Sequence, residues 1–327
     1  MSSKYSNYKV SVIIPAFNAE KYIIRCLESV TRQTYRNIEI IILNDGSTDA
    51  TQSLVEEFSE FDDRIICINK QNSGTYATRR LGFSKASGAY ILNVDSDDFL
   101  EKNALENLMA KMVSTKANLV VGNHNQIIRG RKRLVVNELP ATHTKTELLR
   151  SLLKNEIKGY IWGKLYKKEL LLDLDYRVDN TLQEDFLANL HVFLTKNVKI
   201  AQVDVPVYNY LVHPHSANSS KNRNFIENVI QFNEIVEDLL KTYNYLDPLA
   251  KEFKLYKCRN WVVYARMGGS LAKNRRFIEE FYLENYTSFA KANLAAYQNL
   301  EMLVYKHNYS AGRLLTRSLK KIQEIIY

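Results

Sequence analysis

The chain has 327 residues, of which 46% are hydrophobic and 25% are charged, a composition typical of soluble globular proteins. The three cysteines, Cys26, Cys67 and Cys258, are scattered, which argues against a disulfide framework or a zinc site and favours a reducing compartment. No apolar run approaches the roughly 18 residues that span a bilayer, and residues 1–8 lack the apolar core of a signal peptide. We therefore expect a cytoplasmic location.

The net charge of +9 is unevenly distributed along the chain. Residues 221–327 contain 17 basic and 11 acidic side chains and so carry +6 of this charge. Such an excess favours an anionic partner, namely membrane lipid, a phosphate-linked acceptor or nucleic acid. Solvated helix faces explain it equally well.

Strand and helix patterns alternate through the first hundred residues. Aliphatic runs at 9–14, 38–43, 64–69 and 89–94 predict strands, and the segments between them have helical spacing, with Ser47 or Thr48 as a cap and Gly88 as a helix end. Such alternation predicts a doubly wound α/β sheet, in which ligands bind at the carboxyl ends of the strands. The polar turns at 15–20, 44–49, 70–74 and 95–98 would then meet at one crevice.

The remaining chain predicts a helix at 100–115, a strand at 118–123, a hairpin at 126–136 with a basic tip, and a helix at 144–154. From residue 222 long amphipathic helical patterns run to the end, so we expect two domains, 1–219 and 220–327. The last helix has Leu315 and Leu319 on one face and Arg313 and Arg317 on the other. It fits a membrane surface, and equally its own bundle or a second subunit as a homodimer.

An acidic cluster, Asp95-Ser96-Asp97-Asp98, follows the fourth predicted strand. Asp95 and Asp97 point the same way on an extended backbone, and hard oxygen ligands at this spacing suit Mg²⁺ or Mn²⁺ bound with substrate phosphates. A polar loop that caps the helix near Phe99 is the competing interpretation.

Several motifs are absent. The first turn lacks the glycines of a dinucleotide-binding loop, no P-loop occurs, and Phe99 and Leu100 break an EF-hand. The basic hairpin tip has no interleaved aromatic residues, so we expect no nucleic-acid partner. A phosphohydrolase that uses an Asp-x-Asp pair is a rival, although that pair would be expected after the first strand.

Four segments in order resemble the signature of family-2 glycosyltransferases with the GT-A fold, of the type found in bacterial glycan or glycoprotein biosynthesis. They are Val12-Ile-Ile-Pro-Ala-Phe-Asn18, Asn44-Asp-Gly-Ser-Thr-Asp49, Asn72-Ser-Gly-Thr-Tyr-Ala-Thr-Arg79 and Asp95-Ser-Asp-Asp98. The resemblance covers residues 8–216. It implies a GT-A mixed α/β sheet followed by a C-terminal helical region, and transfer of a sugar from a nucleotide donor with inversion.

The resemblance also implies roles in binding the nucleotide sugar. Pro15, Ala16, Phe17 and Glu20 would lie near the nucleotide base, and Asp45 would accept a hydrogen bond from it. Asn72 and Arg79 would lie beside the ribose and phosphates, and Asp95 and Ser96 at the ribose. Asp97 would bind the Mn²⁺ or Mg²⁺ ion, with Asp95 and His213 as further ligands and His215 as the alternative to His213. The family's usual acidic pair is Asn44-Asp45 here, and its usual Arg-Asn pair is Arg79-Arg80.

The Glu-Asp pair of the family matches Glu184-Asp185. The resemblance implies that Asp185 is the base that deprotonates the acceptor hydroxyl, while Glu184 orients a substrate. Ordinary helix-dipole complementarity is the alternative for an Asp in a first turn. Trp162 and Lys164 match the acceptor-side segment, where a core Trp is the competing interpretation.

The function that follows is metal-dependent transfer of a hexose or N-acetylhexosamine from a UDP-sugar to a glycan, lipid-linked or glycoprotein acceptor. The expected location is the cytoplasm, with peripheral contact at the inner membrane face. The alternative is a non-catalytic transferase-like subunit that binds a partner glycosyltransferase.

Overall fold

The computed structural model describes residues 7–174, 183–213 and 225–267, with scattered positions between 300 and 319. The chain forms two compact units, residues 1–212 and 213–327. The boundary predicted after residue 219 falls among residues 214–224, which lie outside the described part, and it stays a prediction.

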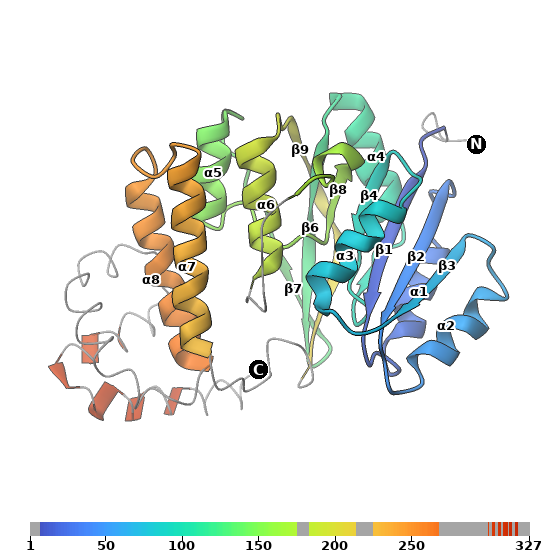
Figure 1. Cartoon of the computed structure of the whole chain (residues 1–327), viewed down its shortest axis with the longest axis horizontal. Coiled ribbons are helices and arrows are strands. Elements are labelled where there is room, and N and C mark those ends of the chain that lie inside the picture. The colour runs from blue at the N-terminus through green and yellow to red at the C-terminus, as the bar shows by residue number, and fades with distance from the viewer. Residues whose placement is uncertain are drawn as a thin grey trace. The chain divides into compact units, whose positions relative to one another are not determined.

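The first unit is built on a nine-stranded mixed sheet with the order β3-β2-β1-β4-β8-β6-β9-β5, with β7 paired to β6 (Figure 1). Its strands are β1 (Val10–Ala16), β2 (Ile38–Asp45), β3 (Ile65–Lys70), β4 (Tyr90–Asn93), β5 (Phe99–Leu100), β6 (Leu119–Ile128), β7 (Arg131–Val135), β8 (Lys164–Lys167) and β9 (Ile200–Val212). Its helices are α1 (Ile23–Thr31), α2 (Thr51–Ser59), α3 (Gly74–Lys85), α4 (Ala104–Thr115), α5 (Lys145–Leu153), α6 (Glu184–Thr195) and the 3₁₀ turn η1 (Lys168–Leu170).

The predicted parallel half of the sheet is confirmed. β1 pairs in parallel with β2 and β4, and β2 pairs in parallel with β3. Every residue of β1 and β2 is buried, as expected for strands that are covered on both faces and therefore read as continuous apolar runs.

The second half of the sheet is mixed, as in the predicted fold. β8 runs antiparallel to β4 and β6, whereas β9 runs parallel to β6. The predicted hairpin is confirmed by the antiparallel pairing of β6 and β7. The two-residue strand β5 was missed, because Phe99–Leu100 is too short to show a period, and α4 begins only at Ala104.

Two helix ends were predicted wrongly. Ser47 and Thr48 bond Asn18 instead of capping α2, and Asp49 accepts from the Thr51 amide at 3.0 Å. Helix α3 ends at Lys85, before Gly88. A side chain at Gly88 would come within 2.7 Å of the Lys9 carbonyl, so this glycine serves close packing instead.

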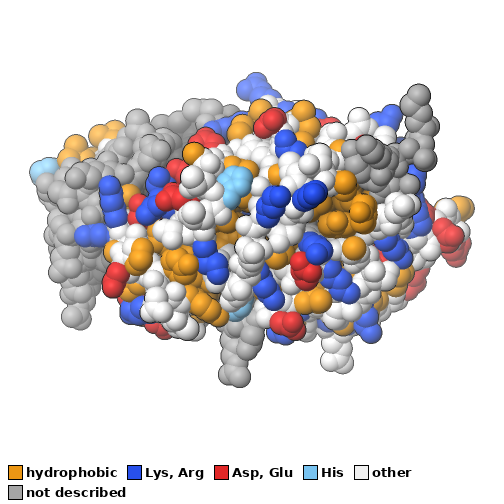
Figure 2. All heavy atoms as spheres, turned by 90° about the horizontal axis from the view of Figure 1, so that it is seen from above, with side chains coloured by type: hydrophobic (Ala, Val, Ile, Leu, Met, Phe, Trp, Pro, Cys, Tyr) orange, Lys and Arg blue, Asp and Glu red, His pale blue; other side chains and the backbone are white. Residues whose placement is uncertain are grey.

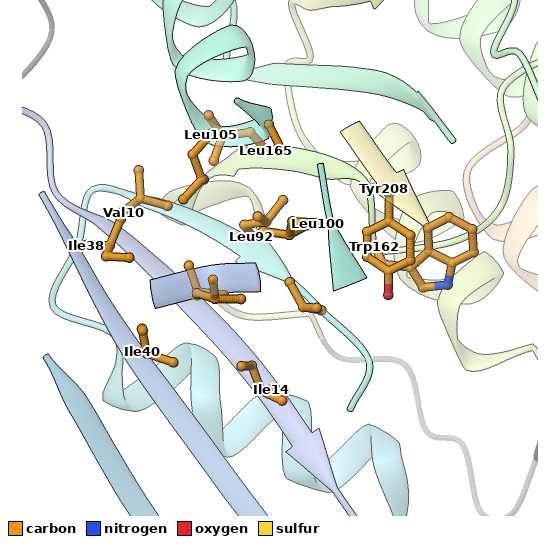
Figure 3. Packing of buried hydrophobic residues seen from close by; sticks show 14 of the residues in the cluster. Val10, Ile14, Ile38, Ile40, Leu92, Leu100, Leu105, Trp162, Leu165 and Tyr208 are labelled. Carbon is orange, nitrogen blue, oxygen red and sulfur yellow. The ribbon is translucent and has the colours of Figure 1, made fainter. Parts of the chain in front are cut away.

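Each face of the sheet has its own core. Alternate residues of β1, β2 and β4, such as Ile14, Ile40 and Leu92, pack with α1, α2 and α4 (Figure 3). Ile13 faces the opposite side, where a Cβ on Gly82 of α3 would lie 2.5 Å from its side chain. Helix α3 therefore lies close against the sheet, which fixes the position of the Arg79 backbone one turn earlier.

The second unit contains α7 (Phe225–Thr242) and α8 (Ala250–Met267), which contact each other. Among the described residues no helix combines the length and apolar character needed to cross a bilayer. Arg313 and Arg317, on which the membrane-surface prediction depends, lie outside the described part. On the face drawn in Figure 2, Lys and Arg side chains are spread among hydrophobic ones instead of forming one patch.

The amino ends of β1, β2 and β4 are joined by a buried carboxylate. Glu39 is 5% exposed and accepts hydrogen bonds from the Ser11 and Ser87 hydroxyls and from the Ser87 and Gly88 amides. Burial opposes its ionisation, but these donors lower the pKa of Glu39 to about 2. The carboxylate thus stabilises the folded chain above its unfolded pKa, and this contribution is lost as the pH falls towards 2.

Replacement of this carboxylate tests its contribution to the fold. Glu39→Ala leaves buried hydroxyl and amide donors without an acceptor, so we expect the free energy of unfolding to fall by about 3 kcal/mol at pH 7, measured by urea titration. Glu28→Ala is the control, since Glu28 forms an exposed pair with Arg32, and it should change stability by less than about 0.5 kcal/mol. Equal effects would contradict the structural role of Glu39.

Candidate active site

Polar turns at the carboxyl ends of β1 and β2 are tied together, as predicted. The Asn18 amide donates to Ser47 at 3.0 Å, and the Thr48 amide donates to the Asn18 side chain at 2.8 Å. Glu20 accepts from the Ala50 amide at 3.1 Å. Pro15 and Ala16 are buried in β1, whereas Phe17, directly after this strand, is 51% exposed.

The turn before α3 joins the same cluster through Asp45. Its carboxylate accepts from the Ser73 amide at 2.9 Å and the Gly74 amide at 3.0 Å, and it forms an ion pair with Lys70. A Cβ on Gly46, whose φ is +74°, would lie 2.9 Å from the Asn72 nitrogen, so only glycine fits there. Asp45 therefore shapes the turn that carries the exposed Asn72, and its role toward a base stays a prediction.

Arg79 joins three carboxylates from distant parts of the chain. One guanidinium nitrogen donates to Asp95 at 2.7 Å, and the other contacts Glu184 at 3.3 Å and forms a close ion pair with Asp185. Arg79 projects from α3, Asp95 follows β4, and the other two begin α6. Arg79 is not a solvated charge on the surface of α3, because its side chain is only 6% exposed.

The electrostatics of this cluster are set by burial. Burial alone would lower the pKa of Arg79, but Asp185, Asp95 and Glu184 raise it, so the guanidinium stays charged. Burial raises the pKa of Asp185 to about 7; Arg79 opposes this rise, and Glu184 and Asp95 add to it. A carboxyl group with a pKa near 7 is suited to accept a proton near neutral pH.

The acidic loop is held from behind by β9. The Tyr208 hydroxyl donates to Asp98 at 2.8 Å and accepts from the Asp95 amide at 3.0 Å, and the Leu211 amide donates to Asp98 at 2.7 Å. Asp98 is fully buried, and burial with Asp95 and Asp97 nearby raises its pKa well above the ordinary value. Asp98 thus anchors the loop to β9 and does not cap a helix.

The described residues contain no group of three His, Cys, Asp or Glu side chains arranged to hold a metal ion. Asp97 is half-buried, and Asp95, which Arg79 binds at 2.7 Å, is 27% exposed, so both carboxylates of the loop reach its surface. Mg²⁺ and Mn²⁺ use one or two carboxylates together with substrate phosphates and water. The loop fits a cation that a diphosphate completes, and Ser96 lies half-buried between the two carboxylates.

Buried polar atoms near Arg79 lack partners among the described residues. Both side-chain amide atoms of Asn93, at the end of β4, and the Nε atom of Arg79 make no hydrogen bond there. Asn93 is fully buried and lies two residues before Asp95. The one feature of the sequence that could have pointed to Asn93 is its place as an amide at the end of an aliphatic strand.

The predicted acceptor residues lie inside the protein. Trp162 is 5% exposed and stacks on Tyr208 at 4.4 Å between ring centroids (Figure 3). Its ring also stacks on Tyr160 at 4.2 Å. Tyr160, which is 42% exposed, forms the accessible end of this stack. Lys164 is 2% exposed, so contact of either predicted residue with an acceptor stays a prediction.

Two further predicted positions, Arg80 and His213, have no shown contact with the Arg79 cluster in the described part of the chain. Arg80 is exposed on α3 and lies over the Tyr76 ring at 5.6 Å. His213 directly follows β9, at the boundary between the two units, and its role as a ligand stays a prediction. The competing His215 lies outside the described residues.

Comparisons with known proteins agree with the resemblance seen in the sequence. Residues 11–174 match the sequence model of the family described as "Glycosyl transferase family 2". The glycosyltransferase GlyA of Streptococcus pneumoniae is 32% identical over 76% of this chain, but the match spans only 37% of GlyA.

Two solved structures share the fold. Staphylococcus aureus TarS 1–349, in complex with UDP-GlcNAc, has a TM-score of 0.61 and 18% identity, covering 96% of this chain and 92% of the other. The mannosyltransferase PcManGT of Pyrobaculum calidifontis, in complex with GDP-Man and Mn²⁺, has a TM-score of 0.55 and 15% identity, covering 93% and 88%. At these identities the similarity shows the fold alone.

The anchor behind the acidic loop can be tested with Tyr208→Phe. The change leaves the buried Asp98 and the Asp95 amide each without one partner, so the free energy of unfolding should fall by about 1–3 kcal/mol. Under the function proposed below, UDP binding with Mn²⁺ should also weaken several-fold by calorimetry, because the loop is then less well held. Tyr35→Phe removes a comparable buried bond to the Tyr8 carbonyl and should leave binding unchanged; equal loss in both variants would contradict the anchor.

Proposed function

Because the chain belongs to glycosyl transferase family 2, we propose that it transfers a hexose or N-acetylhexosamine from a UDP-sugar to an acceptor hydroxyl with inversion. The observation that carries this proposal is the Arg79 cluster, in which a carboxyl group of raised pKa, Asp185, lies across one guanidinium from the Asp95 loop. Such a pair of sites suits a reaction that needs a base on one side and a diphosphate on the other.

The donor would lie along the tied turns. Phe17, with half of its surface exposed, would stack on the nucleotide base, while Asn72 and Arg79 would bind beside the ribose and phosphates. The TarS structure in complex with UDP-GlcNAc supports a uridine nucleotide as the donor. Asp97, with Asp95, would hold the divalent ion, for which the PcManGT complex with Mn²⁺ offers support.

The reaction is a single displacement. Asp185 takes the proton of the acceptor hydroxyl, whose oxygen bonds to the anomeric carbon from the face opposite the diphosphate. The bond from that carbon to the diphosphate oxygen breaks, and its electron pair leaves with UDP. When bound, a divalent cation would neutralise the negative charge that develops on the diphosphate. Arg79 opposes the rise in the pKa of Asp185 and aligns this carboxylate, and Glu184 on the same guanidinium would orient a substrate hydroxyl.

The acceptor belongs to the glycan, lipid-linked or glycoprotein class. Tyr160 is an exposed aromatic ring that would contact the acceptor close to Asp185, since the amide of its neighbour Ile161 donates to Asp185 at 3.3 Å.

Release of UDP from UDP-glucose, UDP-galactose and their N-acetyl forms by the purified chain is the first test. A purified chain that releases UDP from none of these donors would favour the non-catalytic subunit.

Metal binding is tested at Asp97. Asp97→Ala removes one of the two carboxylates proposed as metal ligands, so we expect the affinity for UDP in the presence of Mn²⁺ to fall at least about tenfold. Without a divalent ion, the variant and the parent chain should bind UDP equally weakly. Asp63→Ala, an exposed carboxylate on another loop, is the control. Unchanged calorimetric titrations of Asp97→Ala with Mn²⁺ and UDP would refute this role.

The base is tested by Asp185→Asn, which keeps the size of the side chain. UDP binding should stay within about twofold, and the transfer rate should fall by about 10²–10⁴-fold. In the parent chain the rate should drop as the pH falls below about 7, since the protonated carboxyl cannot accept a proton. Glu169→Gln, an exposed charge, should behave like the parent chain. Full activity in Asp185→Asn would remove Asp185 from the mechanism.

A further inference from the structure

A buried amide on α6 joins this helix to the chain beside the active site. Asn189 is 1% exposed, and its Nδ2 atom donates to the carbonyls of Gly159 at 2.9 Å, Tyr160 at 3.2 Å and Asp185 at 2.9 Å. Its Oδ1 atom accepts from the Tyr166 hydroxyl at 2.8 Å and from Lys164 at 3.1 Å. One side chain therefore connects α6, residues 159–160 and β8.

Lys164 is the unusual partner in this network. Its ammonium donates to the Lys158 carbonyl at 2.5 Å as well as to Asn189, and both acceptors are neutral oxygens. Among the described residues no carboxylate lies within ion-pair distance of it. Burial lowers the pKa of Lys164 to about 7, while the charge of Asp185 raises it. The side chain is thus committed to the interior beside Asp185 and not to the acceptor surface.

The same short segment holds Asp185 at two places. The Ile161 amide donates to the Asp185 carboxylate at 3.3 Å, while Asn189 binds the Asp185 carbonyl together with the carbonyls just before Ile161. A Cβ on Gly159 would lie 3.0 Å from the Phe186 ring, so the segment also packs directly against α6. A shift of this segment relative to α6 would move the only backbone amide that binds the Asp185 carboxylate in the described part of the chain.

We propose that Asn189 and Lys164 are positioning residues, which fix the segment 158–161 against α6 and thereby hold the Asp185 carboxylate in its reactive orientation. The inference rests on the proposed function, because it concerns the orientation of the base in sugar transfer. It assigns Lys164 to the support of Asp185 in place of direct contact with the acceptor. Neither residue touches the reacting atoms, so their effect passes through Asp185.

A double-mutant cycle separates positioning from general stability. Asn189→Leu keeps the approximate size and removes every hydrogen bond, and we expect the kcat of UDP release from the most active donor of the panel to fall about 10- to 100-fold. The Kd for UDP with Mn²⁺ should stay within about twofold. In the Asp185→Asn background the same change should lower the residual rate by less than about twofold, because the group that it positions is already absent.

Lys164→Met provides the second variant and should show the same dependence on Asp185, whether or not Asn189→Leu folds. The matched control is Asn118→Leu, since Asn118 binds the Asn197 carbonyl and the Lys199 amide, both at 2.8 Å, beyond the other end of α6. It should lower thermal stability and leave kcat unchanged.

Equal fold-losses of Asn189→Leu and Lys164→Met in both backgrounds, or no loss in either, would overturn the inference. An inactive parent chain, or full activity in Asp185→Asn, would instead refute the proposed function.

Discussion

The site depends on one buried cation, the Arg79 guanidinium, and on the three carboxylates that bind it. A buried charge is costly unless it is paired and hydrogen-bonded. Asp95, Glu184 and Asp185 supply that pairing from two chain segments about ninety residues apart. Helix α3, the loop after β4 and the start of α6 are therefore fixed to each other by electrostatics as well as by packing. Without Arg79, three carboxylates would be left facing one another.

Buried polar groups hold both the acidic loop and Asp185 in place. Tyr208 bonds both Asp98 and the Asp95 amide, so β9 sets the position of the acidic loop. Asn189 from α6 and the Ile161 amide from the segment before β8 do the same for Asp185. Preorganised groups of this kind cost no reorganisation during the reaction. Strand β9, the segment before β8 and α6 itself thus supply the supports for the acidic loop after β4 and for Asp185.

Much of the fold, and the polar turns that follow its buried strands, were predictable from the sequence for physical reasons. Strands buried on both faces leave continuous aliphatic runs, and the turns after them carry the polar residues that converge. Contacts between distant segments leave no such local signal. The burial of Trp162 and Lys164, the anchor at Tyr208 and the amide of Asn189 all depend on tertiary packing. For Asn189, a lone amide within the apolar run Phe186–Leu194 was the one available indication.

The account is tested most directly by the rate of UDP release in Arg79→Lys, measured with the donor that the parent chain uses best. Lysine keeps the charge but cannot bond Asp95 and Asp185 at once with the planar fork of arginine. We expect kcat to fall at least about 100-fold, while circular dichroism shows a folded chain. A folded Arg79→Lys variant that releases UDP at the rate of the parent chain would contradict the central role of the guanidinium.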